Sequence, residues 1–486
     1  MGFPDLLFTG IRPQKKLDRL VFEDMKLDSM ITGDTIEVMR TPCSAADILA
    51  RQEMFRAISS DPLLKKQLRK LFGDMERICD LSERYSKARC DNEKYLIFLS
   101  LADALTLFYA DAASYNSPAG LYSRFHEFFK KQDENPSVRH IRDELNRILP
   151  SLEPLTCVTY KSTGDTLRVS SERTRPYMSR LLECAANLEI TEAHRPHMEP
   201  HRINSALINA NARLFPEIFS SVKSFYDLYN GFYNQNILGY KTDIDFYLVI
   251  CDFLNRISEA GIPLCFPTVS NPETPGGKKI DIVNAYDVTL LTKGETDIIP
   301  NDAYFDSDEP FFYLTGANGG GKTTYLRTVG VTCLLFLCGS PAPCDKAEIF
   351  AMSGIYTHFP RDERFSGAGR NADEIMRVDE MLAQLDGNSF VLLNETFSTT
   401  NEETAITMTE NLAVKLYDTG EFGVYVTHQH AIENTKIPYM NVLIDRSDSN
   451  RRTFKVAKQK SVYSSYAYDI LKKYSLTKED LDRRFR

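Results

Sequence analysis

The sequence predicts a mixed fold, in which an all-α part is followed by an α/β domain. Apolar residues recur at helical spacing through most of residues 13–149 and 206–259, as they do in amphipathic helices. Further along, short apolar runs alternate with helical segments, which is typical of an α/β domain. Residues 262–279 hold four prolines and two glycines among polar residues, a composition that favours a boundary. We therefore expect one domain over residues 1–265 and a second over residues 266–486.

Composition is that of an ordinary soluble globular protein. The chain has 486 residues, of which 43% are hydrophobic and 26% are charged. No run of about 18 apolar residues predicts a membrane-spanning helix, and the N-terminus does not resemble a signal peptide. The ten cysteines include no C-x-x-C pair, so we expect reduced thiols and a cytoplasmic protein. The net charge of −9 argues against coating nucleic acid by bulk charge, but a local basic face stays possible.

The first expected domain is helical over most of its length. The expected helices cover Pro13–Met30, a segment from Ser44 through Ile58, Pro62–Arg89, Tyr95–Tyr109, Tyr122–Lys131 and Val138–Leu149. Ser44 is a plausible N-cap, and the almost wholly apolar Tyr95–Tyr109 predicts a buried helix. A basic run follows Pro62, with Lys65, Lys66, Arg69 and Lys70. A solvated helix face explains this run better than a nucleic-acid contact does.

Residues 151–259 interrupt and then resume the helical pattern. Leu155–Tyr160 and Thr166–Ser170 are expected to be two strands joined by a turn. His194, His197 and His201 could bind a metal, but the two prolines among them favour a linker. The aromatic residues of 206–259 are spaced as in a helical core, which we prefer to a base-stacking platform.

The second expected domain alternates strands with helices. Expected strands are Ile280–Tyr286, Val288–Leu291, Phe311–Leu314, Ser389–Glu395, Gly423–His428 and a closing hairpin of Val442–Asp445 with Arg452–Val456. Tyr325–Phe336 is expected to be a helix, which the Gly339–Cys344 turn must end. This order predicts an α/β nucleotide-binding domain.

The stretch from Tyr313 to Thr324 contains the pattern G-x-x-x-x-G-K-[ST], placed between an expected strand and an expected helix. Such a loop presents backbone N–H groups and a helix N-terminus to phosphate. The alternative, a glycine-rich turn that binds nothing, fits the complete motif poorly. We expect ATP to bind at Gly316, Ala317, Asn318, Gly319, Gly320, Gly321, Lys322, Thr323 and Thr324. Lys322 would reach the β- and γ-phosphates, and the Thr323 hydroxyl would ligate Mg²⁺.

Polar residues that follow the next apolar strands complete this expected site. Glu395 is our candidate for orienting the attacking water, and Asn394 could hydrogen-bond a water bound to Mg²⁺. His428 could hydrogen-bond the γ-phosphate. The glycine-rich loop that begins at Ser366 could present a hydroxyl and N–H groups to a phosphate. Each of these residues could also be purely structural.

Together these motifs resemble the MutS family of DNA mismatch-repair ATPases, which has an ABC-type fold. The resemblance is specific over about residues 280–470 and suggestive over about 10–260. It is carried by Ile299–Asp302, Gly316–Arg327, Gly339–Pro343, Ser366–Gly367, Leu393–Glu395, Phe397–Asn401, Thr427–His428 and Ser465–Ala467. It implies helical core and lever segments followed by an ABC-type P-loop ATPase that uses ATP and Mg²⁺. It also implies a homodimer in which Ser366 approaches the nucleotide of the opposite subunit.

Departures from the family pattern limit what the resemblance implies. We expect no mismatch-binding or connector domain, and residues 151–200 are expected to be a short remnant of the clamp. Asn394 stands where the family has an aspartate, which could slow turnover. The implied function is ATP hydrolysis coupled to DNA binding, with mismatch recognition itself in doubt. Two alternatives remain: a nucleotide-dependent switch that acts on a protein partner, and a structural relic that binds ATP without hydrolysing it.

Overall fold

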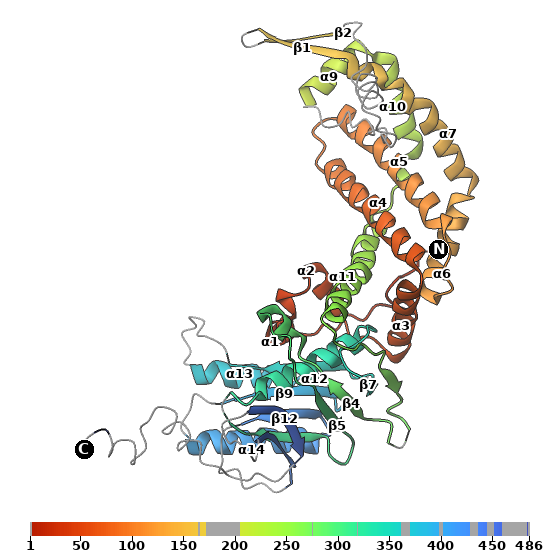
Figure 1. Cartoon of the computed structure of the whole chain (residues 1–486). Coiled ribbons are helices and arrows are strands. Elements are labelled where there is room, and N and C mark those ends of the chain that lie inside the picture. Colours follow the sequence, from red (N-terminus) through yellow and green to blue (C-terminus); the bar gives the residue numbers. More distant parts are fainter. Residues whose placement is uncertain are drawn as a thin grey trace. The chain divides into compact units, whose positions relative to one another are not determined.

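The computed structural model describes residues 2–163, 166–171, 205–274, 276–317, 319–360, 370–397, 402–427, 436–444, 452–458 and 484. The chain forms two compact units, each made from two stretches of sequence (Figure 1). The helical unit comprises Met1–Leu6 and Ser60–Asp245, and the sheet unit comprises Leu7–Ser59 and Phe246–Arg486. These units do not coincide with the expected division at residue 265, because residues 7–59 pack with the sheets.

The helical unit consists mainly of amphipathic helices in the expected order. Their bounds are α4 Pro62–Ser86, α5 Asp91–Ser114, α6 Gly120–Asp133, α7 Pro136–Ser151, α9 Ser205–Leu214, α10 Pro216–Tyr229 and α11 Gly239–Glu259, of which the last begins in this unit. Helices α4 and α7 start with proline and are capped by the side chains of Asp61 and Asn135, as helix N-termini favour. The predicted helices over 62–89, 122–131 and 138–149 are confirmed within a few residues at each end.

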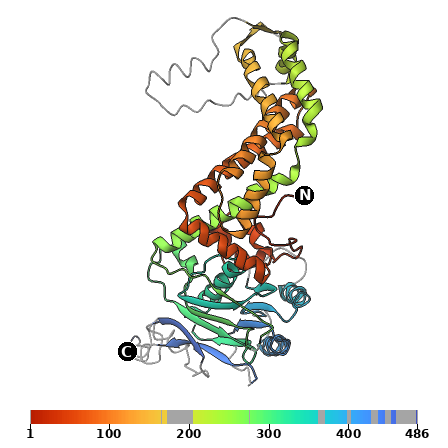
Figure 2. The ribbon, with the colours of Figure 1, turned by 90° about the vertical axis from the view of Figure 1, so that its right-hand side faces the viewer.

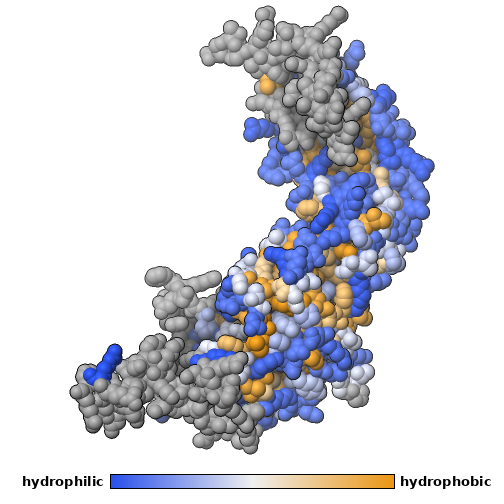
Figure 3. Space-filling view, viewed as in Figure 1, coloured by the Kyte–Doolittle hydropathy of each residue, from blue (hydrophilic) through white to orange (hydrophobic). Residues whose placement is uncertain are grey.

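The core of the helical unit lies around α5. This helix is long and apolar enough to cross a membrane by composition alone, yet 78% of its most apolar window is buried within the structure. The ring of Phe98 in α5 lies 6.1 Å from that of Phe225 and 5.3 Å from that of Tyr226, both in α10. These aromatic residues therefore form core, as predicted. In the view of Figure 3, the surface of this unit is mainly hydrophilic.

A β-hairpin follows α7. Strands β1 (Val158–Thr163) and β2 (Thr166–Ser171) pair antiparallel, with Val158 opposite Ser171, so the predicted pair of strands is confirmed. The three histidines of residues 194–201 lie outside the described residues.

Two sheets form the centre of the sheet unit. The six-stranded sheet has the order β12–β11–β6–β10–β9–β8, and β12 alone runs antiparallel to its neighbour. Its strands are β6 Phe311–Thr315, β8 Gly354–His358, β9 Ser389–Asn394, β10 Phe422–Val426, β11 Tyr439–Ile444 and β12 Arg452–Lys458. The four-stranded sheet has the order β3–β7–β4–β5. Its strands are β3 Thr268–Ser270, β4 Ile280–Ala285, β5 Asn301–Phe305 and β7 Lys346–Phe350.

Helices cover both faces of the six-stranded sheet. Helices α13 (Arg370–Leu382) and α14 (Glu402–Asp418) share one hydrophobic cluster with Tyr313 and Leu393 of the sheet. Figure 2 shows both helices nearly end-on, on one side of the strands. Helix α12 (Lys322–Leu337) packs on the other face, where a Cβ atom at Gly330 would lie 2.9 Å from Leu392. Leu392 and Leu393 point to opposite faces because side chains alternate along a strand.

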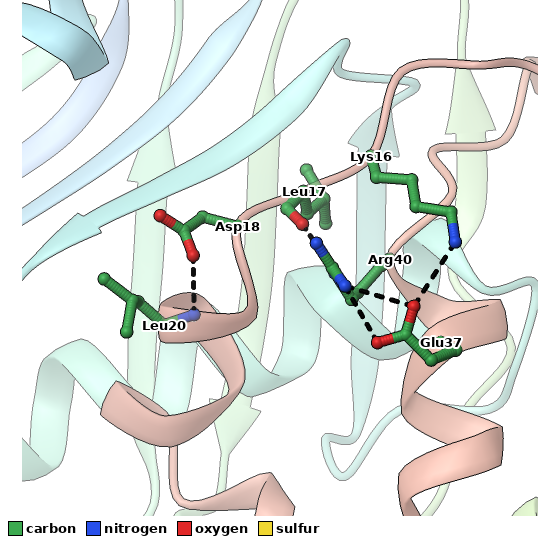
Figure 4. A network of polar contacts seen from close by, with 6 residues as sticks. All are labelled: Lys16, Leu17, Asp18, Leu20, Glu37 and Arg40. Atoms are coloured by element: carbon green, nitrogen blue, oxygen red, sulfur yellow. Dashed lines mark hydrogen bonds and ion pairs between the residues drawn. The ribbon is translucent and has the colours of Figure 1, made fainter.

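The N-terminal stretch of the sheet unit is held together by a polar network. Its elements are α1 Arg19–Asp24, a 3₁₀ turn Leu27–Ser29, α2 Gly33–Met39 and α3 Ala45–Ser60. Nε of Arg40 donates to the Leu17 carbonyl at 2.8 Å, and Nη1 of Arg40 donates to Glu37 at 2.8 Å (Figure 4). Lys16 lies 3.3 Å from Glu37, and Asp18 caps α1. The hydrogen bond from Arg40 lowers the pKa of Glu37.

Helix α3 packs against the end of α12. Ser44 caps α3 as predicted: its hydroxyl accepts from the Asp47 N–H at 3.2 Å, and Asp47 accepts from the Ser44 N–H at 3.2 Å. Gly339 ends α12 with φ +69°, also as predicted. A Cβ atom at Gly339 would lie 2.4 Å from Cβ of Arg51 and 2.8 Å from the Ile48 carbonyl. Glycine at this position therefore allows close contact with α3.

Three predicted elements are wrong in type or extent. Only Arg19–Asp24 of the expected helix 13–30 is α-helical, because the Leu17 N–H bonds Arg40 and Lys26 takes φ +57°. The expected strand 288–291 is a 3₁₀ helix, since Asp287 accepts hydrogen bonds from the Thr289 N–H and hydroxyl. The expected strand start at residue 155 belongs to a 3₁₀ turn that continues α7.

Candidate functional site

The phosphate-loop sequence connects β6 to α12 at the carboxyl edge of the six-stranded sheet. Its backbone takes positive φ at Gly316 (+138°), Gly319 (+68°) and Gly321 (+100°), the last being the N-cap of α12. A Cβ atom at Gly316 would lie 2.9 Å from Val442, and one at Gly320 would lie 2.9 Å from the Ala317 carbonyl. The loop therefore needs glycine both for conformation and for space. Such a loop leaves N–H groups and a helix N-terminus for an anion.

Lys322 folds back over this loop. It is 5% exposed, and its ammonium donates to the carbonyls of Gly316 at 2.9 Å and Ala317 at 3.1 Å. Burial lowers the pKa of Lys322 to about 8; Glu395 acts in the opposite direction, and Arg452 adds to the lowering. A cation held by loop carbonyls can turn toward a phosphate without crossing bulk water. The carboxylate of Glu395 is thus near enough to Lys322 to favour the charged form of the ammonium.

Thr323 and Asn394 supply two neighbouring oxygen atoms. The Thr323 hydroxyl lies 3.5 Å from Oδ1 of Asn394; Asn394 is buried and Thr323 is half-buried. Neutral oxygen atoms beside a phosphate loop suit Mg²⁺, which is usually held by few protein groups together with water and phosphate oxygens. The donor set therefore fits Mg²⁺, although it lacks the carboxylate charge of an aspartate.

Glu395 follows β9 in a left-handed conformation. Its φ is +53°, its N–H donates to the Val426 carbonyl at 2.9 Å, and its side chain is half-buried. Phe397 also has positive φ, at +66°. A non-glycine residue with positive φ is uncommon, and such residues cluster at functional sites. The turn of Glu395–Phe397 is called the Glu395 turn below.

Sheet register explains why distant parts of the sequence meet here. Strand β10 lies between β6 and β9, and Val426 pairs with Leu314 on one side and with Asn394 on the other. The ends of these parallel strands therefore lie at one edge of the sheet, where ligands of α/β proteins bind. The sequence-predicted residues brought together are Lys322, Thr323, Asn394 and Glu395. Asn318, Ser366 and His428 lie outside the described residues.

Two residues beside the loop, Phe454 and Arg452, were not predicted from the sequence. A Cβ atom at Gly321 would lie 3.3 Å from the ring of Phe454, which is 43% exposed and has φ +54°. Arg452, on the same strand, is close enough to lower the pKa of Lys322. The aromatic residue within the polar run Arg451–Lys455 was the available signal. An exposed ring next to a phosphate loop can receive the flat face of a base.

Asn301, in the Ile299–Asp302 motif, joins the two sheets. Its side chain accepts from the Val456 N–H at 2.8 Å and donates to the Phe454 carbonyl at 3.0 Å. The hydroxyl of Tyr325, in α12, donates to the carbonyl of Asp302 at 3.2 Å. The motif therefore holds β12, and with it Phe454, against the start of α12.

The basic run of α4, with Lys65, Lys66, Arg69 and Lys70, carries less free charge than its sequence suggests. Lys70 forms an ion pair with Asp111 at 2.6 Å, which removes part of the charge of the run in α4. Two further basic residues that could contact DNA, Arg173 and Arg175, lie outside the described residues. Within the described ranges, no three His, Cys, Asp or Glu side chains gather as a metal site.

Comparison with known proteins bears on residues 312–478, which match the family described as MutS domain V. The DNA mismatch repair protein MutS of Petrotoga mobilis is 27% identical over 206 residues, which are 40% of this chain and 24% of that protein. The DNA mismatch repair protein MSH2 of Saccharomyces cerevisiae is 27% identical over 200 residues, or 40% and 20%. The DNA mismatch repair protein MutS 1 of Halobacterium salinarum is 36% identical over 126 residues, or 26% and 14%. The matched region thus spans about a quarter or less of each relative.

Proposed function

We infer the function from one premise, that the chain belongs to the MutS family through the domain V at residues 312–478. We propose that it binds and hydrolyses ATP and couples the state of the nucleotide to the binding of DNA. The observation that carries the first part is the meeting of Lys322, Thr323, Asn394 and Glu395 at the end of α12 and the adjoining strands. The relatives named above, which are DNA mismatch repair proteins, support the second part.

The residues of the site have separate roles in this proposal. The glycine loop and Lys322 bind the phosphates, and burial of the site strengthens their interaction. Mg²⁺, when bound, would neutralise charge on the phosphates, and Thr323 and Asn394 would hold it. Glu395 orients the attacking water and accepts its proton. Phe454 receives the base.

Binding and turnover can be measured apart. Calorimetry with ATP and Mg²⁺ tests the phosphate loop, and a steady-state assay of phosphate release tests hydrolysis. Absence of ATP binding would contradict the assignment of the loop. ATP binding without phosphate release would favour a protein that uses ATP as a structural ligand. The first explanation to test would then be the asparagine at residue 394.

Coupling to DNA is tested by titrating duplex, branched and single-stranded DNA at two salt concentrations, each with and without ATP. Affinity should fall steeply with salt, because phosphate contacts release counterions. The net charge of −9 requires any such contact to be local. ATP should change the affinity for at least one of these DNA structures.

We further propose a two-fold dimer with composite ATP sites. In the proposed site, Lys322, Thr323 and Glu395 would lie on one side of the triphosphate. Phosphoryl transfer also needs hydrogen-bond donors on the other side. Ser366 of a second copy would supply them, as the family resemblance implies. Mixing Lys322→Ala with Ser366→Arg subunits should restore about a quarter of the turnover, since half of randomly paired dimers would hold one intact site. Full activity of Ser366→Arg alone would contradict the shared site.

A protein partner in place of DNA is the second candidate function. The observation that favours it is the neutralisation of Lys70 by Asp111, on a chain that is acidic overall. DNA titrations that show no binding at low salt, together with intact ATP hydrolysis, would favour this alternative.

A further inference from the structure

The Glu395 turn is held by hydrogen bonds from two neighbouring strands. Its middle residue, Thr396, is 3% exposed. Nδ1 of His358, at the end of β8, lies 3.1 Å from the Thr396 hydroxyl. The hydroxyl of Tyr425, in β10, donates to the Thr396 carbonyl at 2.7 Å. Thr396 is therefore held through its side chain from one neighbouring strand and through its backbone from the other.

Strand register places these two groups at the same height. His358 pairs with Leu393 in the parallel ladder of β8 and β9, and Tyr425 pairs with Leu393 in the ladder of β10 and β9. Leu393 is the last residue but one of β9. The two side chains consequently flank the point at which the chain leaves the sheet and enters the turn.

The hydrogen bonds have a defined order on the β10 side. Tyr425 has a single hydroxyl proton, which it donates to Thr396, so the Thr409 hydroxyl, 3.0 Å away, must donate to Tyr425. Burial raises the pKa of Tyr425, which keeps it protonated as a donor. Thr409 belongs to α14 and is fully buried. Helix α14 thus supports the Tyr425 hydroxyl, through which strand β10 holds Thr396.

We propose that His358 is a positioning residue, which holds Thr396 so that the preceding Glu395 faces the phosphate loop. Two residues of this turn, Glu395 and Phe397, have positive φ without being glycine. Such a conformation persists only where its surroundings fix it. The hydrogen bond of His358 is the side-chain contact that fixes the turn from the β8 side. This inference rests on the proposed role of Glu395 in orienting the attacking water.

Two substitutions of His358 distinguish positioning from general packing. The amide of asparagine lies at the same distance along the side chain as Nδ1, whereas that of glutamine lies further out. His358→Asn should keep at least a third of the wild-type kcat. His358→Gln and His358→Ala should lose tenfold or more, because neither places a polar atom at the Thr396 hydroxyl. The dissociation constant for ATP should stay within twofold in all three, since none of them alters the phosphate loop.

A double-mutant cycle with Thr396→Val tests whether the two side chains act through each other. If they do, adding His358→Ala to Thr396→Val should lower kcat by less than twofold. Equal kcat values for the asparagine and glutamine variants, or independent losses in the cycle, would overturn the proposal. Melting temperatures of all variants serve as the control for folding.

Hydrogen exchange makes the test independent of hydrolysis. The Glu395 N–H is bonded to Val426, so its exchange reports the order of the turn. Exchange in peptides that cover residues 394–397 should be faster in His358→Ala and His358→Gln than in wild type and His358→Asn. Equal exchange in all four proteins would contradict the positioning role. A wild type that binds ATP without hydrolysing it would instead contradict the proposed function of Glu395, and the exchange result would still decide the role of His358.

Discussion

The phosphate loop and the Glu395 turn both require residues with positive φ, but they use different residue types for it. Both leave a parallel strand at one edge of the six-stranded sheet, and both contain residues with positive φ. In the loop these are glycines, such as Gly316 and Gly321, for which the conformation is cheap. In the turn they are Glu395 and Phe397, and His358 and Tyr425 hold the residue between them.

The difference reflects what each segment presents to a ligand. The loop offers backbone N–H groups, and a side chain at Gly316 or Gly320 would meet Val442 or the Ala317 carbonyl. In the proposed function the turn must offer the carboxylate of Glu395, which glycine at this position would remove. In this chain, the positive φ of the loop could therefore be recognised from its glycines, whereas that of Glu395 and Phe397 could not be recognised from the sequence.

The largest expected effect is on turnover, at the turn. Glu395→Gln should slow ATP hydrolysis by about a hundredfold or more, because the amide cannot accept the proton of water. ATP affinity should change little, since Glu395 is not part of the loop. Phosphate release and calorimetry on the same preparation check both statements. Turnover at the wild-type rate would assign the chemistry to another residue.

The next effect is on binding, at the loop. Lys322→Ala should weaken ATP binding by roughly 10- to 150-fold, the equivalent of a lost charge-assisted hydrogen bond of about 1.5–3 kcal/mol. Lys322→Arg, which keeps the charge, should lose less. Calorimetry with ATP and Mg²⁺ is the measurement, and unchanged affinity for Lys322→Ala would contradict the assignment of the loop.

The pH dependence of the loop should have opposite signs for binding and for stability. The pKa of Lys322 lies at about 8, below its ordinary value of 10.5. Phosphate favours the charged form, so ATP affinity should fall as pH rises above about 8, by up to tenfold per unit. Without ATP the folded state holds fewer protons than the unfolded state in this window. The contribution of Lys322 to stability should therefore rise between pH 8 and 10.5.

Dissociation constants for ATP at pH 7 and pH 9 check the expected fall in affinity. Denaturant unfolding at the same two pH values checks the expected rise in stability. Lys322→Met, which cannot titrate, is the control for both. A dependence that persists in this variant would come from another group.

The smallest effect is on the stability of the turn. Glu395→Gly should be more stable than Glu395→Ala by roughly 0.5–1 kcal/mol, because glycine adopts positive φ without the cost that a Cβ atom brings. Both variants lack the carboxylate, so their difference isolates the backbone. Thermal unfolding of the two proteins measures it. Equal stabilities would mean that the hydrogen bonds to Thr396, and not the cost of positive φ, determine the stability of this turn.

Much of the candidate site could be predicted because its signals are local. The pattern from Gly316 to Thr323 specifies loop, strand and helix at once, and Asn394 and Glu395 end an evident apolar strand. Phe454 stood out only as an aromatic residue in a polar run, and His358 carried no local signal, since the relevance of both depends on which strands lie side by side. The strand assigned to 288–291 failed for a related reason: Asp287 caps a 3₁₀ turn, and apolar alternation does not reveal such a cap.

The origin of the sheet unit from two stretches of sequence constrains how it folds. Arg327 in α12 donates to the Asp24 carbonyl, and the Thr357 hydroxyl donates to the Asp24 carboxylate. Residues 7–59 leave the ribosome long before either partner, so their contacts cannot form until most of the chain has been made. Such long loop closures are slow and leave apolar surface exposed in the meantime. A fragment that starts at residue 266 would lack Met25, which packs against Gly330, and Arg51, which packs against Gly339. We expect such a fragment to aggregate, and adding a peptide of residues 7–59 to improve its refolding.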